Sequence, residues 1–71
     1  MKIYISFGQQ HVHRVNEHTL DRDCIAVISC EDYEQGREIA FKLFGEKFSF
    51  SYTEEEIMPK MIYFPRGFIY L

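Results

Sequence analysis

The chain has 71 residues and a net charge of −3 with histidine neutral, and 46% of its residues are hydrophobic. This length allows one domain, residues 1–71, near the lower limit for independent folding. The acidic balance argues against direct nucleic-acid binding, which needs a basic footprint, and leaves room for a basic protein partner. With no signal peptide and no apolar stretch of roughly 18 residues, we expect a cytoplasmic protein that does not bind membranes.

The first 23 residues divide into a strand and a polar segment. Residues 2–7 alternate between polar and apolar side chains, which predicts a strand with one buried face. Residues 8–23 are too polar for a core element, and we interpret them as a long loop with a ragged hairpin around Asn16 and Glu17. A loop this long in so small a domain is often functional.

The apolar run at residues 24–30 predicts a central strand covered on both faces, because it is short and rich in β-branched residues. Its two cysteines, Cys24 and Cys30, lie roughly 20 Å apart along such a strand. A disulfide needs Cα atoms within about 7 Å. We therefore expect two buried, reduced thiols, as in a reducing cytoplasm.

Residues 32–44 show the helical pattern most clearly. Asp32 is a suitable N-cap, and Gln35 three residues later resembles a capping box. Gly45 is a natural stop after the last turn. Gly36 inside the helix costs about 1 kcal/mol relative to alanine, but it makes a shallow face that lets the helix lie close to a sheet.

The last third of the chain contains shorter elements. Residues 48–52 alternate again and predict a third strand. Residues 53–57 predict a capped helical turn that Pro59 ends. The apolar segments 61–64 and 68–71 flank turn residues and are interpreted as a terminal hairpin.

Together these elements predict an α+β fold. We expect a small antiparallel or mixed sheet of four to five strands with one α-helix packed on one face, in the order β-β-α-β-β(β). If the strands on either side of the helix were parallel neighbours, their crossover would be right-handed.

All three histidines fall in the polar loop, and His11 and His13 would point the same way on an extended backbone. With Glu17, Asp21 or Asp23 they could form a metal site, so a small metal-binding or catalytic domain is the alternative hypothesis. The simpler interpretation is that one histidine holds the loop and the others face water. No spacing favours a nucleophile with its base, so we expect no enzyme and no cofactor.

Several polar loop residues and two acidic clusters are candidates for partner contact; one cluster is Glu31, Asp32 and Glu34, and the other is Glu54, Glu55 and Glu56. The acidic clusters suit solvated helix ends, or a surface that mimics phosphate groups. The candidate partner-binding residues are Gln9, Gln10, His11, His13, Arg14, Glu54, Glu55, Glu56 and Arg66.

Three segments, FGQQHVH at residues 7–13, KLFGEKF at 42–48 and YFPRG at 63–67, resemble a group of short proteins encoded by phages and prophages. The resemblance implies an early accessory factor, and some such families are counter-defence proteins, including anti-CRISPR inhibitors. The implied partner is a host protein or ribonucleoprotein complex, and a homodimer is also open. The shared positions to test are Phe7, Gly8, Gln9, His11, His13, Phe44, Gly45, Pro65, Arg66 and Gly67.

Overall fold

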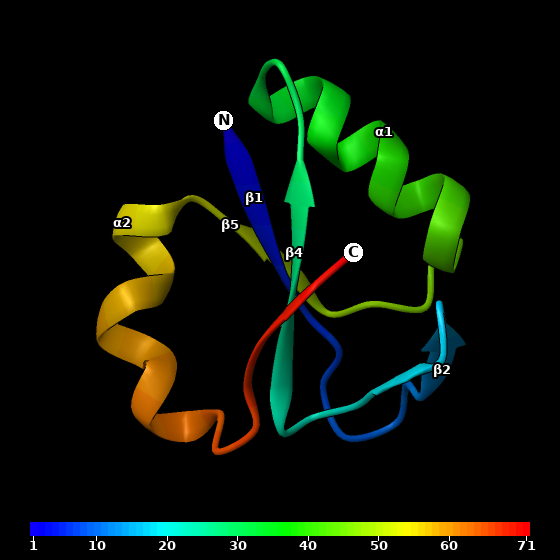
Figure 1. The fold of residues 1–71 in the computed structure, drawn as a ribbon, viewed down its shortest axis with the longest axis vertical. Helices are drawn as coiled ribbons and strands as arrows, with labels where there is room; N and C mark the ends of the chain where they lie inside the picture. Colours follow the sequence, from blue (N-terminus) through cyan, green and yellow to red (C-terminus); the bar gives the residue numbers. More distant parts are fainter.

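The computed structural model describes residues 1–71 and confirms the α+β class (Figure 1). It contains a four-stranded mixed sheet, a separate two-stranded hairpin and two helical regions. None of the helices has the length and apolar character needed to cross a membrane. The elements are β1 (Lys2–Ser6), β2 (His13–Val15), β3 (His18–Leu20), β4 (Cys24–Ser29), α1 (Tyr33–Phe44), β5 (Phe50–Tyr52), α2 (Glu54–Ile57), the 3₁₀ helix η1 (Met58–Tyr63) and β6 (Gly67–Tyr70).

The sheet has the strand order β5-β1-β4-β6. β1 is antiparallel to both β4 and β5, whereas β6 is parallel to β4. The predicted terminal hairpin is therefore wrong, because residues 61–63 lie in η1 with Phe64 as its C-cap, and β6 pairs with β4 instead. A parallel neighbour needs a crossover connection, and the chain between β4 and β6 supplies it with α1, β5, α2 and η1. β4 and β5, on either side of α1, are not neighbours, because β1 lies between them.

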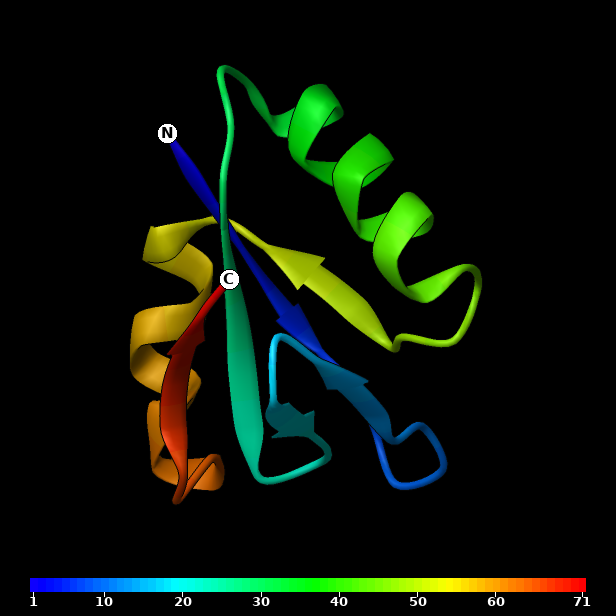
Figure 2. The same ribbon diagram turned by 45° about the vertical axis from the view of Figure 1, so that its right-hand side comes forward.

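Both faces of the sheet are covered, one by the predicted helix and the other by a second helical region that the fold prediction did not include. α1 and the hairpin lie over one face, and α2 with η1 lies over the other (Figure 2). As a result, both faces of β1 are buried, although the alternation of polar and apolar residues in this strand had predicted only one buried face. Ile3 and Ile5 pack under α1, and Tyr4 packs with Ile57 on the opposite face, where it is only 5% exposed.

The polar segment after β1 contains a hairpin, as predicted, formed by β2 and β3. Its two turn residues have positive φ, 50° at Asn16 and 68° at Glu17. A two-residue turn of this kind matches the right-handed twist of the strands it joins. Leu20 at the end of β3 is fully buried and anchors the hairpin on the α1 side of the sheet.

α1 begins and ends where the sequence predicts. The Asp32 side chain accepts a hydrogen bond from the Gln35 amide at 2.7 Å, and Gly45 follows the last turn with φ 63°. The Gln35 side chain accepts from the Glu31 amide, one residue before the cap. Both cysteines are free. Cys24 is buried in β4 as expected, and this burial raises the pKa of its thiol. Cys30 is only half-buried, contrary to expectation.

The capping box at the start of α2 is confirmed. Thr53 Oγ1 accepts from the Glu56 amide, and the Glu56 carboxylate accepts from the Thr53 amide. Hydrogen bonding from Thr53, chiefly from its amide, to this carboxylate lowers the pKa of Glu56. Pro59 does not end the helical region, because it lies in the first turn of η1, where its missing N–H is not needed.

Candidate functional site

The predicted contact residues fall in separate places on the surface. Gln9, Gln10 and His11 line a small hollow of about 250 Å³ after β1. Glu54, Glu55 and Glu56 form the first turn of α2, where Glu56 serves the capping box. Glu54 and Glu55 line a separate groove between α2 and the start of β1, and this groove shares no residue with the hollow. These residues therefore do not form one continuous site.

The two predicted arginines also lie apart. Arg14 is exposed in the middle of β2, paired with Thr19 in β3. Arg66 forms an ion pair with Asp21 at 3.1 Å, and its amide donates to the carbonyl of Asp23 at 2.8 Å. Arg66 thus ties the turn before β6 to the start of β4.

His13 holds the hairpin against the core. Its Nε2 donates to the carbonyl oxygen of Lys47 at 2.6 Å, and its ring lies 5.0 Å from Phe44 and 5.7 Å from Phe7 between centroids. No group of three or more His, Cys, Asp and Glu side chains is placed to hold a metal ion. The geometry therefore supports the structural interpretation of His13 and gives the metal hypothesis no converging ligand set.

Replacing His13 with alanine is expected to lower the free energy of unfolding by about 1–2 kcal/mol, because it removes a hydrogen bond and two aromatic contacts. The matched control is His18→Ala, at an exposed position of the same hairpin, where we expect a change within about 0.5 kcal/mol. Urea denaturation followed by circular dichroism measures both. Equal losses in the two variants would contradict the anchoring role of His13.

The most distinctive surface feature is an apolar region around β6. Four large apolar or aromatic side chains there are more than half exposed: Met58, Ile62, Tyr63 and Tyr70. Three come from η1 and the fourth from β6. The two elements are linked through the core, because Met61 and Phe68 pack on the same buried cluster. Large apolar side chains exposed on neighbouring elements are candidates for an interaction surface.

β6 is also an open edge of the sheet. The Leu71 amide donates to the carbonyl of Val27 at 3.1 Å, and successive residues of a strand direct their backbone groups to alternate sides. Ile69 and Leu71 therefore point their N–H and C=O groups at β4, while those of Phe68 and Tyr70 point away from the sheet. These outward groups can receive a further strand.

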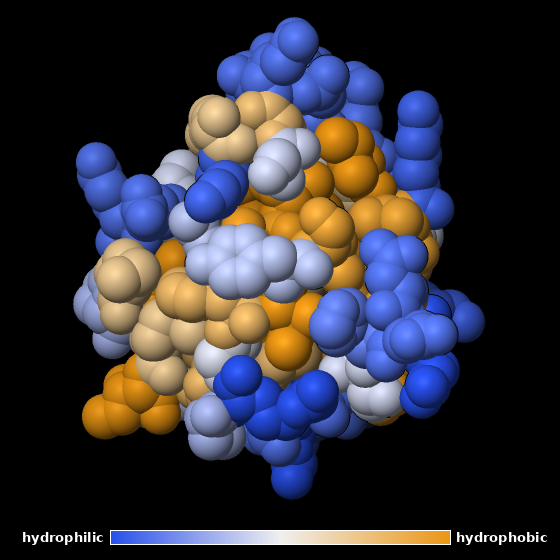
Figure 3. Space-filling view, in the orientation of Figure 1, coloured by the Kyte–Doolittle hydropathy of each residue, from blue (hydrophilic) through white to orange (hydrophobic).

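The other flank of β6 is apolar as well. Ile69 and Leu71 are half-buried and pack on the same cluster as Ile39 of α1. Figure 3 shows an apolar region over the middle of this side of the molecule, with hydrophilic side chains around it. In the same orientation, the C-terminal end of β6 lies in front of β4 (Figure 1). We call β6 with Ile39, Met58, Ile62, Tyr63 and Leu71 the β6 face.

β6 lacks the features that usually protect an edge strand from pairing with another chain. Edge strands are commonly blunted by short length, by charged side chains or by proline. β5, at the opposite edge, is only three residues long. β6 has four residues without a charge; Arg66 just before it is paired with Asp21, and the Lys2 ammonium lies over the ring of Tyr70 rather than at the strand's backbone edge.

Sequence reasoning did not select the β6 face, although one signal was present. No charged residue follows Arg66, and the segment 67–71 is otherwise apolar. Comparison of the chain with protein-family models, curated proteins and solved structures finds no match.

Proposed function

We propose that this protein binds a host protein or ribonucleoprotein complex in the cytoplasm and inhibits or redirects it by contact alone, without catalysis. The favoured case is counter-defence, with a CRISPR effector as the target. That choice of target derives from the resemblance to short phage-encoded proteins. The binding function itself is supported by the β6 face.

The observation that carries the proposal is the uncharged open edge of β6 between two apolar flanks. An extended segment of a partner can add to such an edge, with main-chain hydrogen bonds giving affinity and side-chain contacts giving specificity. The outward groups of Phe68 and Tyr70 offer the hydrogen bonds. The exposed side chains of η1 and Tyr70 offer apolar and aromatic contact, and tyrosine is enriched at binding hot spots.

The proposal predicts that Tyr70→Pro abolishes partner capture while the fold remains intact. Tyr70 directs its N–H away from β4, so proline there removes no bond of the sheet but blocks a new strand. Tyr70→Ala, which keeps the N–H, should retain part of the capture. Tagged protein is incubated with host lysate to which defence complexes have been added, and captured proteins are identified by mass spectrometry.

A second pair of variants separates the β6 face from the polar loop. Ile62→Asp places a charge on the β6 face, where Ile62 is 82% exposed, and should reduce capture at least tenfold. Val12→Asp makes the same kind of change in the loop, where Val12 is 68% exposed, and should not. If Val12→Asp lost the partner and Ile62→Asp kept it, the loop and not the β6 face would be the binding surface.

The counter-defence case has its own test. A host strain with an active CRISPR system should become permissive to a targeted phage when it expresses the protein, and not when it expresses Tyr70→Pro. Light scattering over a concentration series shows whether β6 pairs instead with a second copy of the chain. A dimer that Tyr70→Pro disrupts, without any captured partner, would replace the proposed function with self-association.

A further inference from the structure

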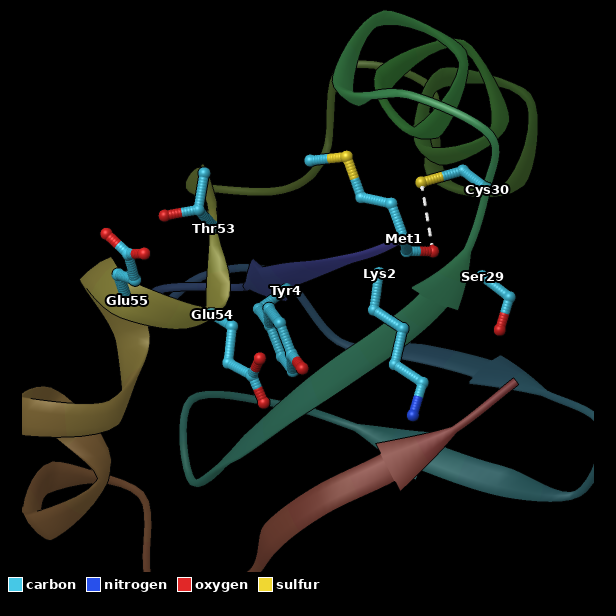
Figure 4. A pocket seen from close by; sticks show the side chains of 8 residues that line it. All are labelled: Met1, Lys2, Tyr4, Ser29, Cys30, Thr53, Glu54 and Glu55. Carbon is cyan, nitrogen blue, oxygen red and sulfur yellow. Dashed lines mark hydrogen bonds between the residues drawn. The ribbon is translucent and has the colours of Figure 1, made fainter.

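A groove of about 690 Å³ opens where β1 begins, β4 ends and α2 starts. Figure 4 shows side chains from all three elements around it, with the end of β6 close by. Its polar lining includes Lys2, Tyr4, Ser29, Cys30, Glu54 and Glu55. This groove is separate from the hollow at Gln9 and His11.

Tyr4 brings a polar group into the groove from an otherwise buried position. The residue is 5% exposed, and its ring lies 5.5 Å from that of Phe68 between centroids. Tyr33 is the one tyrosine whose hydroxyl makes hydrogen bonds within the protein. The Tyr4 hydroxyl therefore has no protein partner. Its pKa is raised by burial and, to a smaller extent, by Glu54 and Tyr70. The groove therefore contains a neutral hydroxyl with unused hydrogen-bonding capacity beside a carboxylate (Figure 4).

The carboxylates of Glu54 and Glu55 are not neutralised by the protein. The two ion pairs of the molecule are Arg22–Asp23 and Arg66–Asp21, and both lie elsewhere. Lys2 also lines the groove, but its Nζ lies over the Tyr70 ring, 5.5 Å from the centroid. An anion in this groove would meet two carboxylates. A cationic N–H donor would instead find acceptors that have no positive charge within 4.0 Å.

We infer that the groove binds a cationic side chain, an arginine guanidinium or a lysine ammonium, of the partner protein. A guanidinium can donate through its planar fork to the Glu54 carboxylate and still reach the neutral hydroxyl of Tyr4, which lies beside it (Figure 4). A strand added to β6 would pass Tyr70, whose ring contacts Lys2 at the groove. The assignment of the cation to the partner rests on the proposed function, whereas the affinity of the groove for a cation does not.

The test titrates the ¹⁵N-labelled full chain with N-acetyl-arginine amide and follows amide shifts by NMR. We expect saturable shifts at Ser29, Cys30 and Glu54, with a dissociation constant on the order of 1–10 mM. N-acetyl-glutamate amide should not shift them. Tyr4→Phe and Glu54→Gln should each weaken binding about 3–10-fold. Glu46→Gln, which changes an exposed carboxylate outside the groove, should leave binding unchanged.

Shifts that fail to saturate, equal shifts with the glutamate probe, or equal effects of Glu54→Gln and Glu46→Gln would each overturn the inference. These outcomes are independent of the partner. If arginine amide binds but the natural protein captures no partner, the proposed function fails and the cation site stands. If Tyr70→Pro loses the partner but arginine amide does not bind, the cation site fails alone.

Discussion

Phe7→Ala is expected to lower the free energy of unfolding by about 3–5 kcal/mol, the usual cost of removing a fully buried phenylalanine. Phe7 follows β1 and is 0% exposed. Its ring lies edge-on to that of Phe44, 5.0 Å away, and also contacts His13. The substitution therefore leaves a cavity where β1, the hairpin and α1 meet. In a domain whose total stability is about 5–15 kcal/mol, this is a large fraction.

Thermal unfolding followed by circular dichroism gives the test. A domain of this size loses about 4–8 °C in Tm per kcal/mol, so we expect Phe7→Ala to melt roughly 12–40 °C below the natural protein. Phe50→Ala is the matched control, because Phe50 lies on the edge strand β5 and is 62% exposed. Its Tm should change by only a few degrees. Similar losses in both variants would show that Phe7 does not hold this junction together.

The elements that were predicted correctly have strong local signals. The α1 boundaries follow from Asp32 and Gly45, whose capping and stop roles depend only on neighbouring residues. The central strand β4 follows from an uninterrupted apolar run. The hairpin at Asn16 follows from a residue type that tolerates positive φ. None of these depends on which distant segment packs against the element.

The elements that were missed depend on distant contacts. Residues 61–64 and 68–71 look alike in sequence, but the first segment forms the end of η1 with its C-cap and the second contributes to β6. Nothing local shows that β6 pairs with β4 rather than with its neighbour. Likewise, the second cover of the sheet could not be anticipated from Tyr4, because its alternation with Ile3 and Ile5 is typical of a half-buried strand.

The candidate surface was missed for a related reason. Polar and charged residues drew attention to the loop and to the acidic clusters, whereas the β6 face consists of residues that usually enter a core. Ile57 is 0% exposed and Ile62 is 82% exposed, although the two are five residues apart in one helical region. Only the docking of α2 and η1 on the sheet decides which isoleucine faces solvent.

Gly36→Val is the second substitution for which we expect a large effect, a loss of about 3 kcal/mol. A Cβ at position 36 would lie 2.8 Å from Cγ1 and Cδ1 of Ile3 and 2.9 Å from the Cys30 sulfur. Ile3 is fully buried, and a closely packed core leaves its side chain little room to move. α1 must then lift away from β1 and β4. Glu38→Val, at an exposed position of the same helix, shows the intrinsic cost of valine, below about 1 kcal/mol.

A double-mutant cycle with Ile3→Ala tests whether this close approach is the cause. Ile3→Ala alone should cost about 2–5 kcal/mol through the cavity it creates. In the double variant, valine at position 36 occupies part of that cavity, so the combined loss should fall below the sum of the single losses by at least about 1 kcal/mol. Urea denaturation of the four proteins measures this coupling. Additive losses would mean that Gly36 is required for a reason other than its contact with Ile3, whereas the expected coupling would identify it as the residue that sets the distance between α1 and the sheet.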